Sequence, residues 1–462
     1  MQTMDAVAPF WREAGMPEGA LGRLALTGAE PALPSPFAVG TAAQASIALS
    51  GLAAAALREQ RGGGPQDVAV EMRHAAIEFR SERAMRVDGA PPPDPWDRIA
   101  GTYRCGDGRW VRLHTNFPHH RDGVLKLLGC AYDRDAVAKA LQAWTGYDFE
   151  QAAAEAGMCV AAMRTLDEWD AHPHSAAVAT RPVVSIERIG DAPPIDPPAG
   201  GDRPLAEVRV LELTRVIAGP VCGRTLAAHG AEVLLITSPA LPSVPSLVVD
   251  TGRGKRSAQL DLRAPRDAET MRGLLRDADV FLQGYRPGGL AELGFGPEDA
   301  ARLRPGVVYV SLSAYGTTGP WAGRRGFDSL VQTATGMNAA EAEAAGIEGP
   351  KVLPAQANDH AAGYLLAFGA MAALHRRAAE GGSWHVQVSL ARTAHWIRGL
   401  GRIPGGLDCD DPSQEDIADL LEDAPSDFGM LTYVRHAALL SQTPARWALP
   451  SVPLGTHPAT WG

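Results

Sequence analysis

The feature that most constrains the fold is an alternation of short apolar runs with helical segments between residues 208 and 312. The apolar runs are Val208–Leu213, Ala231–Ile236, Asp279–Leu282 and Val307–Leu312, and the helical segments are Pro220–His229 and Ala264–Asp277. Runs that are apolar at nearly every position are buried on both faces, which predicts a parallel, doubly wound sheet. Ligands bind such sheets at the carboxyl ends of the strands, so we expect a site in the loops that start at Thr214, Gly284 and Ser313.

Two segments rich in Pro and Gly, Ala90–Pro95 and Gly190–Pro204, divide the chain. Between them we expect a hairpin around Gly106–Gly108, and then helices and a strand. The expected elements are a hairpin of Thr102–Cys105 with Arg109–Leu113, helices at Asp135–Trp144 and Asp148–Ala156, and a strand at Arg181–Ile186. The prediction is therefore an α/β protein with a Rossmann-like large domain over residues 201–398 and a small α+β domain over residues 90–200. Residues 1–89 and 399–462 form an N-terminal and a C-terminal segment.

An internal repeat links the two halves of the chain. A shift of 318 residues places Thr41–Glu78 on Asp359–Trp396 without a gap, with Gly51 on Gly369 and Val68 on Val386. Each copy is typical of an Ala-rich helix followed by a Gly loop and a strand. The copies differ at their first position, where Thr41 corresponds to Asp359.

Charge and hydropathy exclude several classes of protein. The chain of 462 residues has 43 Lys and Arg against 53 Asp and Glu, a net charge of −10, so a general nucleic-acid or anionic-membrane surface is not expected. The longest apolar runs, Ala45–Leu57 and Leu365–Leu374, are shorter than the roughly 20 residues that a bilayer requires. The first thirty residues resemble neither a signal peptide nor a transit peptide, and we expect a cytoplasmic protein.

Common catalytic signatures are absent from the sequence. There is no phosphate-binding Walker loop, no nucleophile elbow and no zinc-protease motif, and Gly294–Gly296 lacks the rest of a dinucleotide fingerprint. His119 and His120, and the pair His172 and His174, have no Cys or carboxylate at ligand spacing. We therefore expect these histidines on the surface or in turns, and no metal site.

Basic residues follow the predicted strands and favour a ligand that carries phosphate. They are Arg253, Lys255, Arg256, Arg263, Arg286, Arg324 and Arg325. Arg and Lys recognise pyrophosphate through charge and forked hydrogen bonds. Asp359 starts an Ala-rich helix, and from the local sequence alone it is typical of a helix cap.

Five ordered motifs resemble the class III CoA-transferases, also called the carnitine dehydratase group. They are Val208–Pro220, Gly254–Ser257, Tyr285–Gly288, Tyr309–Gly316 and Arg325–Asp328. Phe37–Ile189 is similar to the second half of the same family, so the order of the pieces is that of a permuted or partial tandem protein. The resemblance implies a Rossmann-like large domain, a smaller domain and often two interlocked subunits, which leaves a homodimer open.

The resemblance also implies the chemistry. The nucleophile of the family falls on Asp359, which would attack an acyl-CoA thioester, become an aspartyl-CoA thioester and pass coenzyme A to a small carboxylate. The N-terminus of its helix would keep this carboxylate ionised. The contacts to coenzyme A would fall on Val216, Ile217, Ala218, Leu260, Arg263, Gly284, Tyr285, Arg286 and Arg325.

Three functional readings stay open from the sequence. Racemases that resemble this group have a His where this chain has Phe327, which cannot act as a base, so transfer of coenzyme A is favoured over racemisation. The alternatives are a non-catalytic CoA-binding protein, and an acyl-CoA isomerase, racemase or lyase on the same scaffold.

Overall fold

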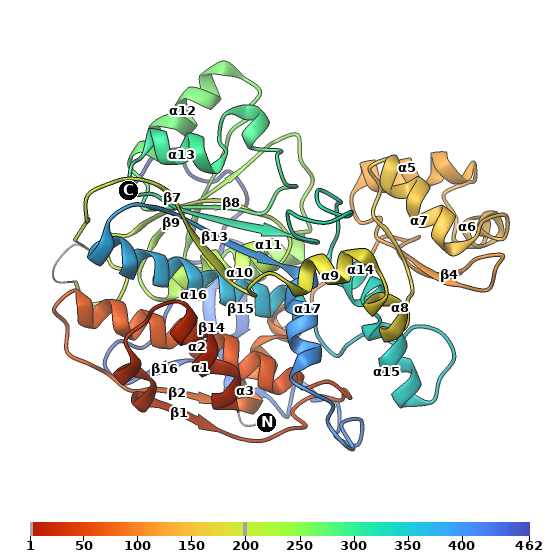
Figure 1. The fold of residues 1–462 in the computed structure, drawn as a ribbon, viewed down its shortest axis with the longest axis horizontal. Helices are drawn as coiled ribbons and strands as arrows, with labels where there is room; N and C mark the ends of the chain where they lie inside the picture. The colour runs from red at the N-terminus through yellow and green to blue at the C-terminus, as the bar shows by residue number, and fades with distance from the viewer. Residues whose placement is uncertain (1–2, 197–200) are drawn as a thin grey trace.

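The computed structural model describes residues 3–196 and 201–462, and its centre is a seven-stranded sheet. The strand order is β10-β9-β8-β11-β12-β13-β7 (Figure 1). The first six strands are parallel, which confirms the predicted doubly wound sheet, and β7 pairs antiparallel with β13 at one edge. The strands are β7 (Ser185–Gly190), β8 (Arg209–Leu213), β9 (Glu232–Thr237), β10 (Lys255–Gln259), β11 (Val280–Gln283), β12 (Val308–Ser313) and β13 (Ser383–Ser389).

Helices cover both faces of this sheet. Successive side chains along a strand point to opposite faces, so Val210 of β8 packs with the core around α10 and α16, whereas Leu211 packs with the core around α12. Figure 1 shows α12 and α13 on one side of the sheet, and α10 and α16 on the other. The covering helices are α10 (Ala218–Ala228), α12 (Pro265–Arg276), α13 (Pro297–Leu303) and α16 (Ala357–Glu380).

A smaller unit, at the right of Figure 1, has three antiparallel strands and an apolar core of its own. Its hairpin pairs Gly101 with Leu113 and Arg104 with Trp110, as the Gly-rich loop between them predicts. The elements of this unit are β4 (Gly101–Arg104), β5 (Trp110–Leu113), β6 (Val160–Ala162), α5 (Pro118–Leu128), α6 (Arg134–Leu141) and α7 (Gly146–Glu155).

The strand predicted at Arg181–Ile186 is displaced. The structure has β7 at Ser185–Gly190, and this strand belongs to the large sheet rather than to the smaller unit. Val183 and Val184, whose apolar character suggested the strand, are buried in the core just before it, and Pro182 has no N–H for a strand ladder. Of the predicted linker Gly190–Pro204, residues 197–200 lie outside the described residues.

The internal repeat is present in three dimensions. Its copies are α2 (Val39–Gln60), β2 (Val68–Glu71) and α3 (Met72–Glu78), and then α16, β13 and α17 (Leu390–Gly399). The residues that precede the two long helices have nearly the same backbone angles, φ −76° and ψ 61° at Ala38, and φ −77° and ψ 64° at Gln356. Glu71 caps α3 and the corresponding Ser389 caps α17, each through its side chain.

The two copies exchange their return strands, by which we mean the strand that follows each copy in the chain. β7, which follows the first copy, pairs with β13 of the second, and β16 (Leu439–Leu440), which follows the second copy, pairs with β2 of the first. A Cβ on Gly51 would lie 2.8 Å from Ala438 and one on Gly369 would lie 2.9 Å from Val184, so each long helix packs closely against the incoming segment. The two halves are therefore interleaved within one chain.

Helix α2 is long and apolar enough to cross a bilayer by length and composition alone, because it extends on both sides of the run Ala45–Leu57. All of its apolar stretch is buried in the protein, where α2 packs along α16. Small residues on both helices permit this close packing. In this structure α2 is a core helix.

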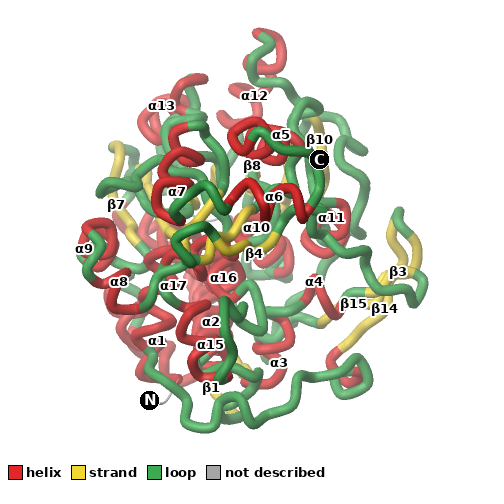
Figure 2. The backbone as a smooth tube through the Cα atoms, turned by 90° about the vertical axis from the view of Figure 1, so that its right-hand side faces the viewer, coloured by secondary structure: helices red, strands yellow, loops and turns green. Residues whose placement is uncertain are grey.

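The remaining elements connect these units. Figure 2 shows β3, β14 and β15 as a separate small sheet at one side of the molecule. The segment around His457 runs along β10 and covers the second edge of the large sheet. The N–H of His457 donates to the carbonyl of Ser257 in β10 at 2.7 Å. The elements are α1 (Thr3–Glu13), a 3₁₀ turn (Glu18–Arg23), β1 (Leu24–Thr27), α4 (Ser81–Ala84), β3 (Arg86–Val87), α8 (Leu166–Asp170), α9 (Pro173–Ala179), α11 (Pro245–Thr251), a 3₁₀ turn (Ala291–Leu293), α14 (Asp328–Ala334), α15 (Met337–Ala345), a 3₁₀ turn (Ala418–Leu420), β14 (Leu421–Ser426) and β15 (Gly429–Val434).

Candidate active site

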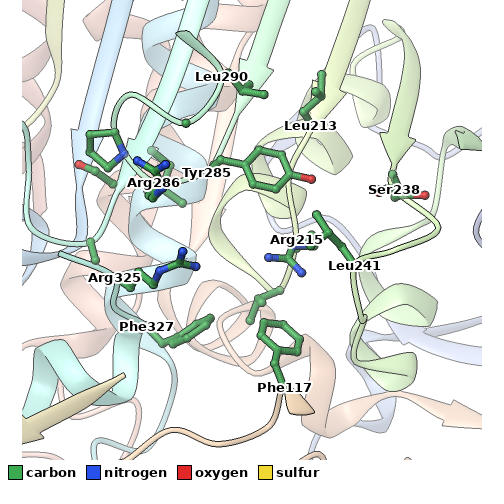
Figure 3. Close-up of a pocket in the computed structure, with 18 of the residues that line it drawn as sticks. Phe117, Leu213, Arg215, Ser238, Leu241, Tyr285, Arg286, Leu290, Arg325 and Phe327 are labelled. Carbon is green, nitrogen blue, oxygen red and sulfur yellow. The ribbon is translucent and has the colours of Figure 1, made fainter. Parts of the chain in front are cut away.

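A cavity of about 580 Å³ lies at the carboxyl ends of the parallel strands (Figure 3). Arg215 follows β8, Thr237 ends β9, Gly284 follows β11 and Ser313 ends β12, and all four residues line the cavity. The loops after Thr214, Gly284 and Ser313 therefore meet at one site, where the topology of the sheet predicts a ligand.

The ten residues that the sequence analysis assigned to the site all line this cavity. They are Asp359, Val216, Ile217, Ala218, Leu260, Arg263, Gly284, Tyr285, Arg286 and Arg325. They come from segments that are far apart in the chain, and the parallel sheet and the start of α16 bring them together.

Local backbone geometry explains how α16 reaches the loop after β8. Val216 has a φ of 73°, which a β-branched residue rarely adopts, and such strain is found mostly at binding and catalytic sites. A Cβ on Gly363 would lie 2.6 Å from the carbonyl oxygen of Ala218, so glycine is required for this approach. Asp359, one turn earlier on α16, is thereby brought to the cavity that the loop lines.

Asp359 lies in the first turn of α16 and its residue is 6% exposed. Its backbone N–H donates to Oδ2 of Asp328 at 2.8 Å, and Nδ2 of Asn358 donates to Oδ1 of the same carboxyl at 3.2 Å. Asp328, at the start of α14, therefore caps α16 from a neighbouring helix. Within residues 3–196 and 201–462 the carboxylate of Asp359 has no hydrogen-bond partner, and it is available to a ligand in the cavity.

The electrostatic surroundings of Asp359 differ from the expectation that a helix N-terminus keeps it ionised. Burial, and then the negative charges of Asp328 and Glu82, raise the pKa of Asp359 well above its usual range. Its own N–H group is taken up by Asp328, and the pKa of Asp328 is itself raised by burial. Once ionised, a poorly solvated carboxylate of raised pKa is a stronger nucleophile than one in water.

Two arginines face each other across the cavity, as Figure 3 shows for Arg215 and Arg325. Arg215 donates to the carbonyl of Pro242 at 3.0 Å, and Arg325 has neither an ion pair nor a hydrogen bond to any residue that the structure describes. Arg263 and Arg286 are already paired, with Asp261 at 2.9 Å and with Glu292 at 2.8 Å. Arg215 and Arg325 are therefore the cations best placed to meet an anion, and they supply a local basic patch on an acidic protein.

A further wall of the cavity comes from α5 and the residue before it, and the sequence did not predict this wall. Phe117, His119 and His120 line the cavity; His119 is exposed, as expected, whereas His120 was expected on the surface or in a turn and is buried. His120 is 3% exposed, and burial together with His119, Arg325 and Arg215 lowers its pKa to about 3, so its ring is neutral. No signal near these residues in the sequence shows that the smaller unit docks here. Across residues 3–196 and 201–462, no three His, Cys, Asp or Glu side chains form a group that could hold a metal ion.

Three known proteins each resemble between 41% and 78% of this chain. An acyl-CoA transferase of Gibberella moniliformis is 30% identical over 408 residues, which cover 78% of this chain and 70% of that protein. The succinyl-CoA:glutarate CoA-transferase of Mus musculus is 32% identical over 202 residues, which cover 41% of this chain and 45% of the mouse enzyme. The crystal structure of a CaiB/BaiF family protein from Brucella suis is 28% identical, with a TM-score of 0.38 over 43% of this chain and 56% of that chain.

A family model gives the broadest match. The model of CoA-transferase family III matches residues 15–197 and again residues 205–400, so both halves of the chain correspond to one family. The two matches are separated by residues 198–204 of the linker, and each contains one copy of the internal repeat. The chain belongs to CoA-transferase family III.

Proposed function

We propose that this protein transfers coenzyme A between an acyl-CoA thioester and a small carboxylic acid, with Asp359 as the nucleophile. The observation that carries the proposal is that the carboxylate of Asp359 shares one cavity with the nine residues that the family resemblance assigns to coenzyme A. The names of the relatives, an acyl-CoA transferase and a succinyl-CoA:glutarate CoA-transferase, support a carboxylate as the second substrate.

The proposed reaction begins with attack of the Asp359 carboxylate on the thioester carbonyl carbon of the donor. The C–S bond breaks, and a mixed anhydride and the thiolate of coenzyme A are formed. The thiolate then attacks the carbonyl carbon of Asp359, the anhydride C–O bond breaks, and the donor carboxylate leaves an aspartyl-CoA thioester behind. An acceptor carboxylate repeats the two steps in reverse order, which regenerates Asp359 without net gain or loss of a proton.

In this proposal the chain holds coenzyme A along the carboxyl edge of the sheet. Val216, Ile217 and Ala218 line the cavity where the loop after β8 approaches α16, and in this proposal the pantetheine arm passes them to reach Asp359. Arg325 and Arg215 meet the phosphates, because their guanidinium groups face the cavity and lack carboxylate partners. The other residues assigned to the proposed CoA site line the same cavity: Leu260, Arg263, Gly284, Tyr285 and Arg286.

Covalent trapping tests the proposed function directly. The purified protein is incubated with an acyl-CoA, with and without hydroxylamine, and the peptide that contains Asp359 is analysed by mass. We expect an aspartyl hydroxamate only when both reagents are present, and loss of CoA exchange in Asp359→Ala. An unmodified Asp359 together with full activity of Asp359→Ala would refute the proposal.

Measurements of CoA binding, of CoA exchange and of the acyl product separate the alternative functions. Tight binding of coenzyme A without exchange of labelled coenzyme A between carboxylates would identify a non-catalytic CoA-binding protein. A change in the acyl group without exchange would identify an isomerase, racemase or lyase. We place the reaction in the cytoplasm, where acyl-CoA thioesters are available as substrates.

A further inference from the structure

The internal repeat provides a control within the molecule for the surroundings of Asp359. The N–H of Thr41 donates to Oε1 of Glu30 at 2.6 Å, just as the N–H of Asp359 donates to Oδ2 of Asp328 at 2.8 Å. Thr41 and Asp359 occupy the same position of the two matching helices. A carboxylate cap at this position is therefore a feature of both copies, including the copy that has no nucleophile.

A second contact is present only in the copy that carries Asp359. Nε2 of His360 lies 3.0 Å from Oε2 of Glu82, whose side chain comes from α4 in the first half of the chain. The side chain of His360 is fully buried and that of Glu82 is 11% exposed. The residue that matches His360 in the other copy is Ala42, which has no polar side chain. The contact is thus associated with the nucleophile and not with the repeated fold.

We propose that Glu82 is a positioning residue for the nucleophile: through His360 it fixes the first turn of α16 and places a negative charge behind the carboxylate of Asp359. The inference rests on the proposed function, because it assigns Asp359 the role of nucleophile. Glu82 has no contact with the cavity, so it acts through its neighbours and not on the substrate.

His360 is held on two sides. Its ring stacks on Phe79 with the centroids 5.4 Å apart, and Phe79 also belongs to the first half of the chain. Because His360 follows Asp359 directly in α16, an anchored imidazole restricts the backbone that carries the reacting carboxylate. A displacement of about 1 Å at a reacting group lowers a rate by roughly a hundredfold, so this restriction matters for catalysis.

Several charged groups surround Asp359 and have to be considered together. Asp328 of α14 and Glu82 of α4 both raise the pKa of Asp359, after the larger effect of burial. Burial opposes the ionisation of Glu82, but the hydrogen bond and charge of His360 and the charge of Arg83 lower its pKa below the usual value. In addition, the charge of Asp250 of α11 raises the pKa of Glu82, and the charge of Asp328 raises the pKa of Arg112 of β5. Glu82 is therefore an ionised group that opposes the ionisation of Asp359.

The chain offers a matched control in Glu78, which ends α3 four residues before Glu82. Glu78 is also buried, also comes from the first half of the chain, and accepts a hydrogen bond from the hydroxyl of Tyr364 on α16. Unlike Glu82, it does not contribute to the pKa shift of Asp359. If Glu82 only stabilised the fold, replacing Glu82 and replacing Glu78 should have the same effects on activity and stability.

The experiment compares Glu82→Gln, Glu82→Asp and Glu78→Gln with the unsubstituted chain. The measurements are the pH dependence of kcat/KM for CoA exchange, the pH dependence of hydroxylamine trapping at Asp359, and stability in urea. For Glu82→Gln we expect the acidic limb of both profiles to move to lower pH by at least about half a unit, because a negative charge is removed. We also expect kcat to fall about tenfold with little change in KM for the acyl-CoA.

The other variants separate charge from geometry. Glu82→Asp keeps the charge but is too short for the same contact, so kcat should fall while the acidic limb stays in place. Glu78→Gln should lower stability in urea and leave the acidic limb unchanged. If Glu82→Gln does not fold, His360→Gln tests the same contact from the other side, and a fall in kcat is expected again.

Two results would overturn the inference. One is an acidic limb that is the same in Glu82→Gln and the unsubstituted chain, and the other is an equal shift in Glu78→Gln. In both cases Asp359 would still be trapped by hydroxylamine, so the proposed function would stand. Absence of trapping and of exchange in the unsubstituted chain would instead overturn the proposed function, and this inference with it.

Discussion

Oδ2 of Asp328 accepts the backbone N–H of Asp359 at 2.8 Å, and this contact holds two buried carboxyl groups next to each other at the start of α16. The arrangement secures the end of the helix, but it opposes ionisation of the group that we propose as the nucleophile. Binding and catalytic sites often lower the stability of the folded protein in this way.

Asp359→Asn should therefore make the protein more stable at neutral pH. The pKa of Asp359 is raised in the folded protein, so above the usual pKa of an Asp the unfolded chain has lost a proton that the folded chain still binds. The free energy of unfolding of the unsubstituted protein then falls as pH rises through the window between the two pKa values, and Asn removes this loss. We expect Asp359→Asn to be more stable by at least about 1 kcal/mol at pH 8, and by less at pH 4.5, in urea denaturation. The same difference at both pH values would contradict the raised pKa.

Arg325→Met should weaken the binding of free coenzyme A by about 10- to 100-fold, because a hydrogen bond to a charged group contributes roughly 1.5–3 kcal/mol. Arg325 lines the cavity and has no carboxylate partner in the described parts of the chain. Arg302→Met is the control, since Arg302 lies outside the cavity, is exposed and is paired with Asp299 at 2.8 Å, and we expect a change of less than about threefold. Calorimetric titration with coenzyme A measures both, and equal effects would argue against the assignment of Arg325.

Gly363→Ala should impair CoA binding and exchange by separating α16 from the loop after β8. The new Cβ would lie 2.6 Å from the carbonyl oxygen of Ala218, so helix and loop have to move apart. Gly273→Ala is a matched control in α12, where a Cβ meets nothing within 4 Å and should stabilise the helix by roughly 0.5–1 kcal/mol. Affinity for coenzyme A and stability in urea are measured for both variants. Unchanged affinity in Gly363→Ala would show that the contact does not shape the site.

Arg224→Met should destabilise the protein by about 3–5 kcal/mol, because it leaves part of a buried carboxylate without its partner. Arg224 pairs with Asp250 at 2.9 Å, and both side chains are 1% exposed. Arg398→Met, which breaks an exposed pair with Asp170, should cost about 1 kcal/mol or less. Chemical denaturation compares the two, and similar losses would show that burial of the first pair has no special effect.

Cleavage of the chain at a protease site introduced at Asp202 should not separate the two halves. Paired strands and the contact of α2 with α16 connect residues before and after this point, so we expect the fragments to elute together and to part only in urea. Fragments that separate in native buffer would contradict the interleaved arrangement.

Gel filtration of the uncut protein tests the homodimer that the family resemblance implies. Limited proteolysis tests our proposed division into residues 1–89, 90–200, 201–398 and 399–462.

Much of the large sheet can be predicted from the sequence. Val208–Leu213 and Val307–Leu312 are apolar at almost every position because both of their faces are covered, and this pattern is local. The cavity residues could be listed because an ordered set of motifs marks them, and the parallel topology explains why they meet. The hairpin between Gly101 and Leu113 followed from its Gly-rich loop.

What could not be predicted depends on contacts between distant segments. The position of β7 is set by β13, about 200 residues later, and not by the apolar residues Val183 and Val184. The cap on Asp359 comes from Asp328, 31 residues earlier, and it changes the expected ionisation. His120 was taken for a surface residue because nothing nearby in the chain shows that α5 docks against the cavity.

The exchange of return strands also constrains how the protein is made. The N–H of Asp67 donates to Oγ of Ser441, 374 residues later, next to the pairing of β2 with β16. During synthesis, the sheet near the N-terminus therefore keeps an open edge until residues 439–440 have left the ribosome. Exposed edges of this kind recruit other strands, so newly made chains that stop short of residue 439 should aggregate. Completion of the sheet in the first half thus depends on a segment that is made only after the second copy of the repeat.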